Sequence, residues 1–220
     1  MSWVEIKSAI NSSIGTHSFD SLDKIIEKEL YENYYNAIST YVDVWGDANG
    51  TIEIVPKGVE GIQSGPYNGK NYVRIILPNG IKNIGDNSFN NCGQLKRMII
   101  PEGVESIGSQ AFLHCGHLVD VTIPNSVKEI GNSAFQRCLD LKNITLPKGI
   151  VELNDNTFYD CSSLEIVRIP KSLKRIYNNV FANCSALSHV YYDGTESDWQ
   201  DIVAGEGNSN LFHATIHMNY

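Results

Sequence analysis

The sequence repeats itself every 23 residues, and this period limits the fold more than any other feature. All five cysteines follow it, and so do five prolines and five phenylalanines. The three columns are Cys92, Cys115, Cys138, Cys161 and Cys184; Pro78, Pro101, Pro124, Pro147 and Pro170; and Phe89, Phe112, Phe135, Phe158 and Phe181. A fixed period of roughly 20 to 50 residues is typical of stacked repeats, in which each unit buries its apolar face only against its neighbours.

Each repeat opens with the pattern L-x-x-(V/I)-x-(I/L), which predicts a short β-strand with its apolar side facing the core. A proline follows directly and is expected to end the pairing of the strand, because it fixes φ and has no N–H to donate. A second apolar pair comes next, as in Val104 and Ile107. Its spacing predicts a short extended or turn-like segment on the opposite side of the coil.

The last part of each repeat is expected to form one capped helical turn. It begins with a column of residue types that commonly cap helices, namely Asp86, Ser109, Asn132, Asp155 and Asn178. Phenylalanine and cysteine follow three and six residues later, a spacing that places both on one inward face. The thiols are expected to be buried and reduced, since free cysteine is among the most buried residue types and five thiols cannot all pair.

These columns resemble the BspA-like class of bacterial leucine-rich repeats over the stretch from Ile52 to Tyr192. An earlier, degenerate copy is interpreted as being in register at Ile52, Ile54, Pro56, Val59 and Ile62, with Tyr67 in the phenylalanine column one residue short. The resemblance implies an α/β repeat solenoid, a right-handed superhelix with a concave parallel β-sheet and short helical turns. It also implies a surface or secreted protein that binds host or partner proteins, as an adhesin does.

Three regions are expected along the chain. Residues 51–192 hold about six repeats, and residues 193–220 resemble the terminal cap of the family, with a short helix around Trp199 and Ile202 and a final strand. Residues 1–50 lie outside the repeat, and an apolar stripe predicts a helix from about Ser18–Asp20 to about residue 44. Two interpretations of that helix stay open: a cap over the first coil, or a docking or self-association element.

Composition excludes several classes of function. The formal net charge of −8 argues against general binding of nucleic acid, which needs clustered Lys and Arg, and against adhesion to an anionic membrane. The sequence has no run of 18 apolar residues, so no membrane-spanning helix is predicted. The first residues show no secretory signal, so the sequence as written predicts a cytoplasmic protein whereas the resemblance implies an exported one, and the location is left open.

The sequence contains no motif of a known catalytic or cofactor site, so we expect neither an enzyme nor a bound cofactor or metal. His114, Cys115 and His117 are close in sequence, but the cysteine belongs to an inward column and the histidines are expected to diverge from it. His213 and His217 are expected on the final strand, where an even separation points both to one face. A weak metal site there is a minor alternative.

The outward positions of the strands form the candidate binding surface, on the concave face that the resemblance implies. They comprise Arg74, Ile76, Arg97, Ile99, Asp120, Thr122, Asn143, Thr145, Ile166, Arg168, His189 and Tyr191. Aromatic and Arg residues dominate binding energy at interfaces, so this surface is predicted to bind a protein or a glycan. Two alternatives stay open: exposed Ile and Thr simply favour strand formation, or the solenoid is a structural arm anchored to a larger assembly through the N-terminal helix.

Overall fold

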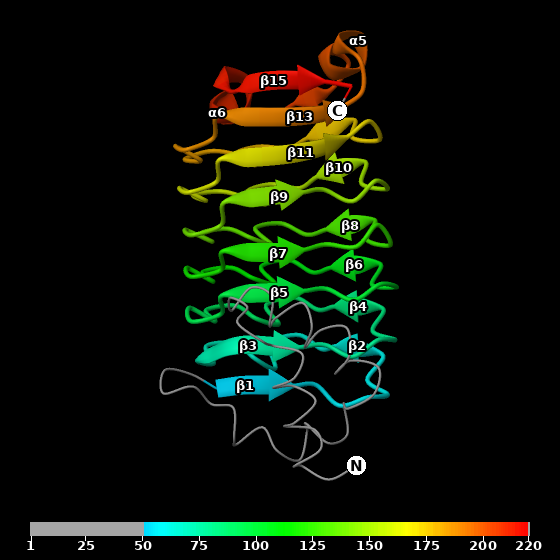
Figure 1. Ribbon diagram of the computed structural model, residues 1–220, viewed down its shortest axis with the longest axis vertical. Coiled ribbons are helices and arrows are strands. Elements are labelled where there is room, and N and C mark those ends of the chain that lie inside the picture. Colours follow the sequence, from blue (N-terminus) through cyan, green and yellow to red (C-terminus); the bar gives the residue numbers. More distant parts are fainter. Residues whose placement is uncertain (1–50, 220) are drawn as a thin grey trace, which may run out of the picture. The chain divides into compact units, whose positions relative to one another are not determined.

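Residues 51–219, which the computed structural model describes, form a solenoid of about seven coils with parallel strands and little helix (Figure 1). The longer strands, here called the broad row, are β1 (Thr51–Ile54), β3 (Tyr72–Ile76), β5 (Arg97–Ile99), β7 (Asp120–Thr122), β9 (Asn143–Thr145), β11 (Ile166–Pro170), β13 (His189–Asp193) and β15 (Thr215–Met218). The two-residue strands, here called the narrow row, are β2 (Gly61–Ile62), β4 (Asn83–Ile84), β6 (Ser106–Ile107), β8 (Glu129–Ile130), β10 (Glu152–Leu153), β12 (Arg175–Ile176) and β14 (Val203–Ala204).

Within each sheet, a strand pairs in parallel with the equivalent strand of the next coil, and each row consists of two such sheets. The order in the broad row is β1-β3-β5-β7 and β9-β11-β13-β15, and in the narrow row β2-β4-β6-β8 and β10-β12-β14. Arg97 pairs with Asp120, and Ile166 pairs with His189, so paired residues differ by one repeat. The stacked-repeat solenoid predicted from the period is therefore confirmed.

The phenylalanine column forms a continuous stack through the core. All five side chains are 0% exposed, and neighbouring rings lie 5.1 to 5.5 Å apart between centroids. Tyr67 continues the stack, with its ring 5.3 Å from that of Phe89. Each buried ring contributes about 1.5 to 3 kcal/mol by leaving water. Because every ring packs on the ring of the next coil, the coils stabilise one another.

The cysteine column links each coil to the preceding one. All five thiols are free and buried, and each Sγ donates to the carbonyl oxygen of the aromatic residue one coil earlier, at 3.0 to 3.3 Å. Burial raises the pKa of Cys92 to about 11 and that of Cys184 to about 12. The expectation of buried thiols is confirmed, and their role combines packing with a weak hydrogen bond.

The predicted capped helical turn is wrong for the coils between residues 51 and 193, where the chain forms turns instead. Two residues in each turn region adopt positive φ, for example Gln110 at 58° and His114 at 61°. The capping column serves a different purpose, since Asp86 Oδ1 accepts the N–H of Ser109 at 2.7 Å, one coil further on. Asp, Asn and Ser bond to nearby backbone in turns as readily as at helix starts, so residue type alone does not separate the two roles.

The first coil differs from its predicted register by one position. Ile52 pairs with Arg74, and Ile54 pairs with Ile76, so both isoleucines lie in the outward columns rather than the inward ones. Val55 is the buried residue at the end of β1. Paired residues of the first two coils differ by 22 positions rather than 23, as in Ile62 with Ile84, so this coil is one residue shorter than the others.

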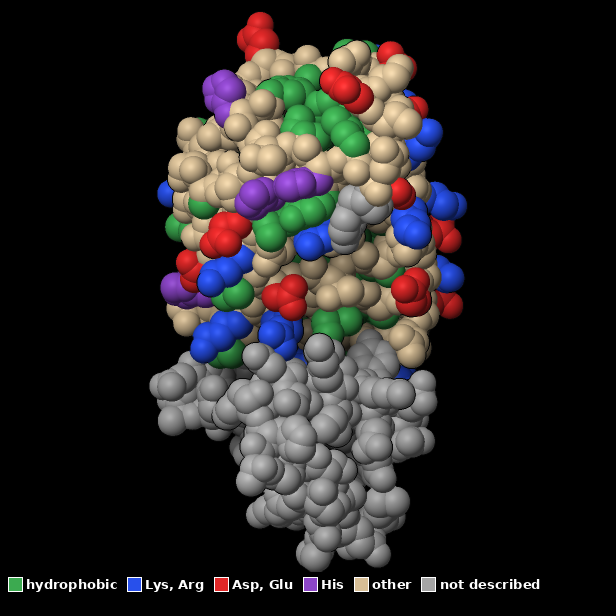
Figure 2. Space-filling view, turned by 45° about the horizontal axis from the view of Figure 1, so that its top comes forward, with side chains coloured by type: hydrophobic (Ala, Val, Ile, Leu, Met, Phe, Trp, Pro, Cys, Tyr) green, Lys and Arg blue, Asp and Glu red, His purple; other side chains and the backbone are tan. Residues whose placement is uncertain are grey.

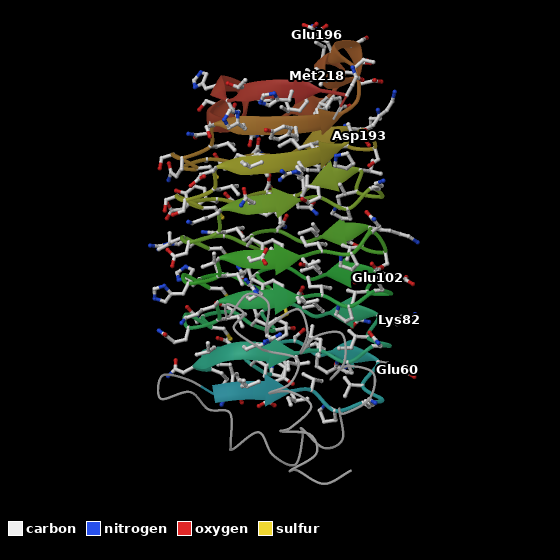
Figure 3. The ribbon with its side chains drawn as sticks, in the orientation of Figure 1. Glu60, Lys82, Glu102, Asp193, Glu196 and Met218 are labelled. Carbon is white, nitrogen blue, oxygen red and sulfur yellow. The ribbon has the colours of Figure 1, made fainter. Side chains whose placement is uncertain are left out.

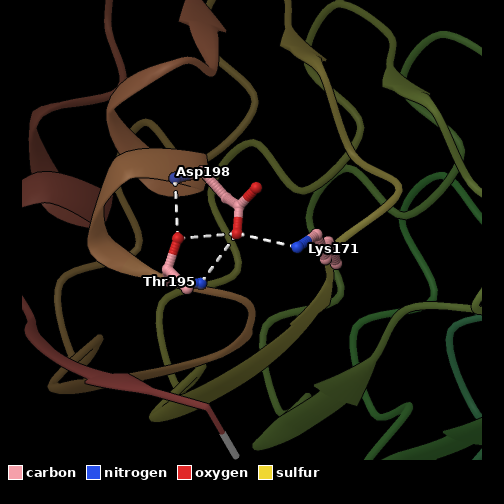
Figure 4. Close-up of polar contacts among 3 residues, drawn as sticks. All are labelled: Lys171, Thr195 and Asp198. Carbon is pink, nitrogen blue, oxygen red and sulfur yellow. Dashed lines mark hydrogen bonds and ion pairs between the residues drawn. The ribbon is translucent and has the colours of Figure 1, made fainter.

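The C-terminal residues close the stack with short elements. The helix expected around Trp199 and Ile202 corresponds to α5 (Glu196–Gln200), which ends before Ile202. The helix begins with a capping box, in which Thr195 accepts from the Asp198 N–H and Asp198 accepts from the Thr195 N–H (Figure 4). Lys171 Nζ lies 3.0 Å from Asp198 Oδ2, and the hydrogen bonds from Thr195 and from Lys171 lower the pKa of the Asp198 carboxyl.

Asn208 ends the hydrogen-bond ladder of the turn region. In earlier coils the phenylalanine N–H donates to a carbonyl of the following coil, as Phe158 does to Val180. The last one, Phe181, donates to Asn208 Oδ1 at 3.1 Å. Asn208 Nδ2 donates in turn to the Tyr177 carbonyl at 2.8 Å, and the residue is 3% exposed. The side chain of Asn208 therefore takes the place of a backbone carbonyl in the last coil.

The outer edge of the coils is polar. Glu60, Lys82 and Glu102 lie at this edge and are exposed (Figure 3). Between residues 51 and 219, no helix is both long and apolar enough to cross a bilayer. The helix predicted within residues 1–50 lies outside the described residues.

Candidate binding face

All twelve predicted site residues lie on strands of the broad row and alternate with buried positions. In β5, half-buried Arg97 and Ile99 flank Met98, which is 0% exposed; in β7, exposed Asp120 and Thr122 flank a buried valine. This alternation follows from the two-residue period of a strand. The twelve positions therefore form one surface, which we call the strand face.

The strand face is longer than the sequence indicated. In β15, Thr215 pairs with His189 and His217 pairs with Tyr191, so the final strand adds one residue to each outward column. Ile52 and Ile54 extend the columns at the other end, through their pairing with β3. The even spacing of outward residues was the signal for His217. The position of Tyr67, one residue short of the phenylalanine column, was the signal for the shorter first coil.

The N-terminal half of the strand face is basic and aliphatic. Arg74 pairs with Arg97, and Arg97 Nε lies 3.4 Å from Asp120 Oδ2. An ion pair of this exposed kind contributes about 0 to 1 kcal/mol, so it positions the arginine more than it stabilises the fold. The middle strands present small polar side chains, including Thr145 on β9.

The C-terminal half carries a cluster of Arg168, His189, Tyr191 and His217, here called the aromatic–basic cluster. The Arg168 guanidinium lies 5.2 Å from the centroid of the Tyr191 ring. The Tyr191 ring also stacks on the His217 ring, with the ring centroids 4.5 Å apart and an angle of 13° between the ring planes. Figure 2 shows histidine, hydrophobic and basic side chains gathered near the C-terminal end of the surface. Stacked aromatics and a cation over a ring each contribute about 0.5 to 1.5 kcal/mol, so the cluster is held in place before any ligand arrives.

The narrow row offers a useful comparison. Arg175 on β12 lies 5.6 Å from the centroid of the Tyr177 ring. This pair has the same residue types and the same cation–ring contact as Arg168 and Tyr191, but it belongs to the other strand row. Replacing each pair in turn therefore distinguishes the contribution of the strand face to binding from that of an Arg–Tyr pair elsewhere on the surface.

The histidines singled out in the sequence do not form a three-ligand metal centre. Cys115 is 0% exposed, while His114 and His117 are exposed and diverge from it, as expected. The prediction for His213 is wrong, because this residue ends α6 (Ser209–His213) and does not reach β15. Within residues 51–219, no group of three or more His, Cys, Asp or Glu side chains is arranged to hold a metal ion.

The coil geometry and the strand face define a leucine-rich-repeat solenoid. Residues 52–195 match the family model of the BspA type leucine rich repeat region, in six copies. Because this match covers more than half of the sequence, the chain belongs to the BspA-type leucine-rich-repeat family. Members of leucine-rich-repeat families are typically non-catalytic and commonly bind proteins.

Two solved structures have the same fold. A T. pallidum leucine rich repeat protein is 25% identical, with a TM-score of 0.66, over 76% of this chain and 79% of that one. A leucine-rich repeat protein from Bacteroides ovatus is 20% identical, with a TM-score of 0.53, over 76% of this chain and 62% of that one. No curated protein matches the sequence significantly.

Proposed function

We propose that the chain is a non-catalytic interaction module that binds a protein partner through the strand face, in the manner of an adhesin. Membership of a family whose members commonly bind proteins supports this proposal. The observation that carries it is the aromatic–basic cluster, because Tyr and Arg are enriched among the residues that dominate binding energy. The proposal assigns residues 51–192 to binding and residues 193–220 to capping the array.

The dimensions of the strand face suit a protein ligand. Eight parallel strands at about 4.8 Å spacing span about 34 Å, which is comparable with a standard protein–protein interface. The family resemblance implies that this face is concave, so that a convex or extended partner could contact several coils together. An extended face of this length suits a macromolecule better than a small substrate.

The charge of the strand face gives the expected partner its character. Its twelve predicted residues include three arginines and one aspartate, whereas the whole chain has a formal net charge of −8. A partner with acidic side chains would therefore be steered toward this face rather than toward the rest of the molecule. A glycan is the alternative ligand, since sugars also pack on aromatic rings such as that of Tyr191.

Part of the strand face has a simpler explanation and is not used for the test. Thr122 and Thr145 fit the pleated surface of a strand well, so their presence needs no ligand. Tyr191 also fits a strand well, but Arg168 is not among the residue types that favour strands, and its guanidinium is held over the Tyr191 ring. The test therefore targets these two residues.

The experiment compares two double variants of the full chain. The partner is first captured on immobilised wild-type protein, identified, and purified. We expect Arg168→Ala with Tyr191→Ala to weaken its binding by at least about 30-fold, which corresponds to the loss of one dominant contact of about 2 kcal/mol. Arg175→Ala with Tyr177→Ala removes the same residue types from the narrow row and should leave affinity unchanged.

Thermal unfolding of both double variants separates binding from folding. Each variant loses one cation–ring contact, and the variant of Arg168 and Tyr191 also loses the stack of Tyr191 on His217, so we expect small decreases in Tm, the larger one in that variant. Equal affinities of the two variants for the partner would contradict the proposal. If the chain bound a purified glycan but no protein, the proposed partner would be wrong, whereas the strand face would remain the proposed binding surface.

A further inference from the structure

Two imidazoles meet on the strand face at hydrogen-bond distance. His189 Nδ1 lies 3.1 Å from His217 Nε2, and the ring centroids are 5.3 Å apart. His189 lies on β13 opposite Thr215, and His217 lies two residues further along β15. Both side chains are half-buried. They come from different strands, so backbone pairing fixes the distance between them.

This separation matches two ligands of one metal ion. Zinc–imidazole bonds are about 2.0 to 2.1 Å long, so two nitrogens at an angle of about 90° to 110° around one ion lie about 2.8 to 3.4 Å apart. The observed 3.1 Å falls within that range. A small rotation of each ring points both lone pairs at a common ion, and the terminal torsion of histidine is broad enough to allow it.

The surroundings hold the pair in place. The Tyr191 ring stacks on His217 and lies 6.4 Å from the His189 ring, so it packs beside both imidazoles. The Arg168 guanidinium lies 5.2 Å from the centroid of the same Tyr191 ring. Rigid neighbours of this kind reduce the ordering cost of binding an ion.

We propose that His189 and His217 form a two-histidine site for a divalent transition-metal ion of the class that prefers imidazole, such as Zn²⁺, Ni²⁺ or Cu²⁺. Hard ions such as Mg²⁺ and Ca²⁺ prefer oxygen ligands and are excluded by the donor set. Two protein ligands leave the other coordination positions for water or for donor atoms of a bound molecule. The site does not depend on the proposed protein partner.

A hydrogen bond between the two rings is the competing explanation of the same distance. In that case one imidazole donates its N–H to the other, and the pair has no affinity for metals beyond that of an isolated surface histidine. Metal binding by the full chain distinguishes the two explanations directly.

The test is calorimetric titration of the full chain with Zn²⁺, at a pH at which imidazole is mostly neutral. We expect one saturable site in the wild type, lost in His217→Ala and in His189→Ala. His213→Ala removes an exposed histidine of α6 and serves as the matched control, which should bind as the wild type does. An excess of Mg²⁺ should not compete.

A second readout covers the case in which a variant folds poorly. Zn²⁺ should raise the Tm of the wild type and of His213→Ala, and should broaden or shift the imidazole NMR signals of two histidines only. Absence of saturable Zn²⁺ binding to the wild type would overturn the proposal. So would Zn²⁺ binding that survives in both His217→Ala and His189→Ala, because the ion would then sit elsewhere.

Discussion

Replacing Asn208 tests how the solenoid ends. The N–H of Phe181, which is 0% exposed, donates to the Asn208 side chain rather than to a backbone carbonyl of the last coil, at 3.1 Å to Oδ1. Asn208 Nδ2 also donates to the carbonyls of Tyr177, Gly205 and Glu206, at 2.8, 3.0 and 3.3 Å. One side chain therefore satisfies four backbone groups at the end of the stack.

The structure sets the size of the expected effect. Asn208→Ala leaves the Phe181 N–H and the Tyr177 carbonyl without their partners, and each unsatisfied buried group costs about 1 to 3 kcal/mol. Water reaches part of the emptied site, so we expect a total loss of about 2 to 4 kcal/mol in the free energy of unfolding. Because each coil contacts only its neighbours, the loss should appear first as fraying of the C-terminal coils.

Asn208→Asp makes the same test sensitive to pH. The carboxylate still accepts from Phe181, but it cannot donate to Tyr177, and burial raises the pKa of the new carboxyl. An acid with a raised folded-state pKa contributes its stability at low pH and loses it as pH rises. The variant should therefore be least stable at neutral pH and approach the wild type below about pH 4.

The assay is urea unfolding followed by circular dichroism, combined with hydrogen exchange of the C-terminal peptides. Asn210→Ala alters a partly exposed asparagine of the same helix and should change the free energy of unfolding by less than about 0.5 kcal/mol. If Asn208→Ala were no more destabilising than Asn210→Ala, the capping role assigned to Asn208 would be refuted.

Three further predictions concern the coils and the cap. Burial and raised pKa values should keep all five thiols unreactive toward a disulfide reagent until the protein unfolds. Cys138→Ala should lower the free energy of unfolding in urea by about 1 to 2 kcal/mol, because it leaves a cavity and removes the hydrogen bond that Sγ donates. Gln110→Gly should raise the free energy of unfolding by about 0.5 to 1 kcal/mol, since Gln110 has a φ of 58° that glycine adopts without strain. Asp198→Asn should lower Tm at neutral pH, and the difference should shrink as pH falls below about 4, because a lowered carboxyl pKa stabilises only above the unfolded value.

Each of these predictions has its own control. Thiol counts in denaturant give the full reactivity against which the folded protein is compared, and rapid native labelling would contradict the buried column. Gly116→Ala is the control for Gln110→Gly. It adds a side chain at a position outside the left-handed region, where the new Cβ would have no neighbour within 4 Å, so it should not lower the free energy of unfolding. The Tm difference between the wild type and Asp198→Asn should be smaller at pH 3 than at pH 7. A larger difference at pH 3 would contradict the prediction for Asp198.

The repeat could be predicted from the sequence because its period places every column in the same environment. Leu118, Phe135 and Cys161 are all 0% exposed for this reason. The capping column was misread because Asp86 is as suited to a turn as to a helix start, and only the pairing of coils decides between the two. No pattern revealed Asn208, whose role depends on the backbone groups of Tyr177 and Phe181 in the preceding coil.

The strand face could be predicted in the same way, but its details could not. Alternation placed Arg168 and Tyr191 on one surface, and the strand pairing brings them into contact. The meeting of His189 with His217 depends on the register of β15, which follows a cap of irregular spacing. His213 was misplaced for the same reason, because a helix occupies the residues before that strand.

The most direct measurement of the central claim is hydrogen exchange of the chain with and without its captured partner. Binding through the strand face predicts slower exchange in peptides that cover β11 and β13, with the peptide that covers β12 and Tyr177 unchanged. Protection confined to the narrow row, with β11 and β13 exchanging as in the free chain, would show that the partner binds elsewhere.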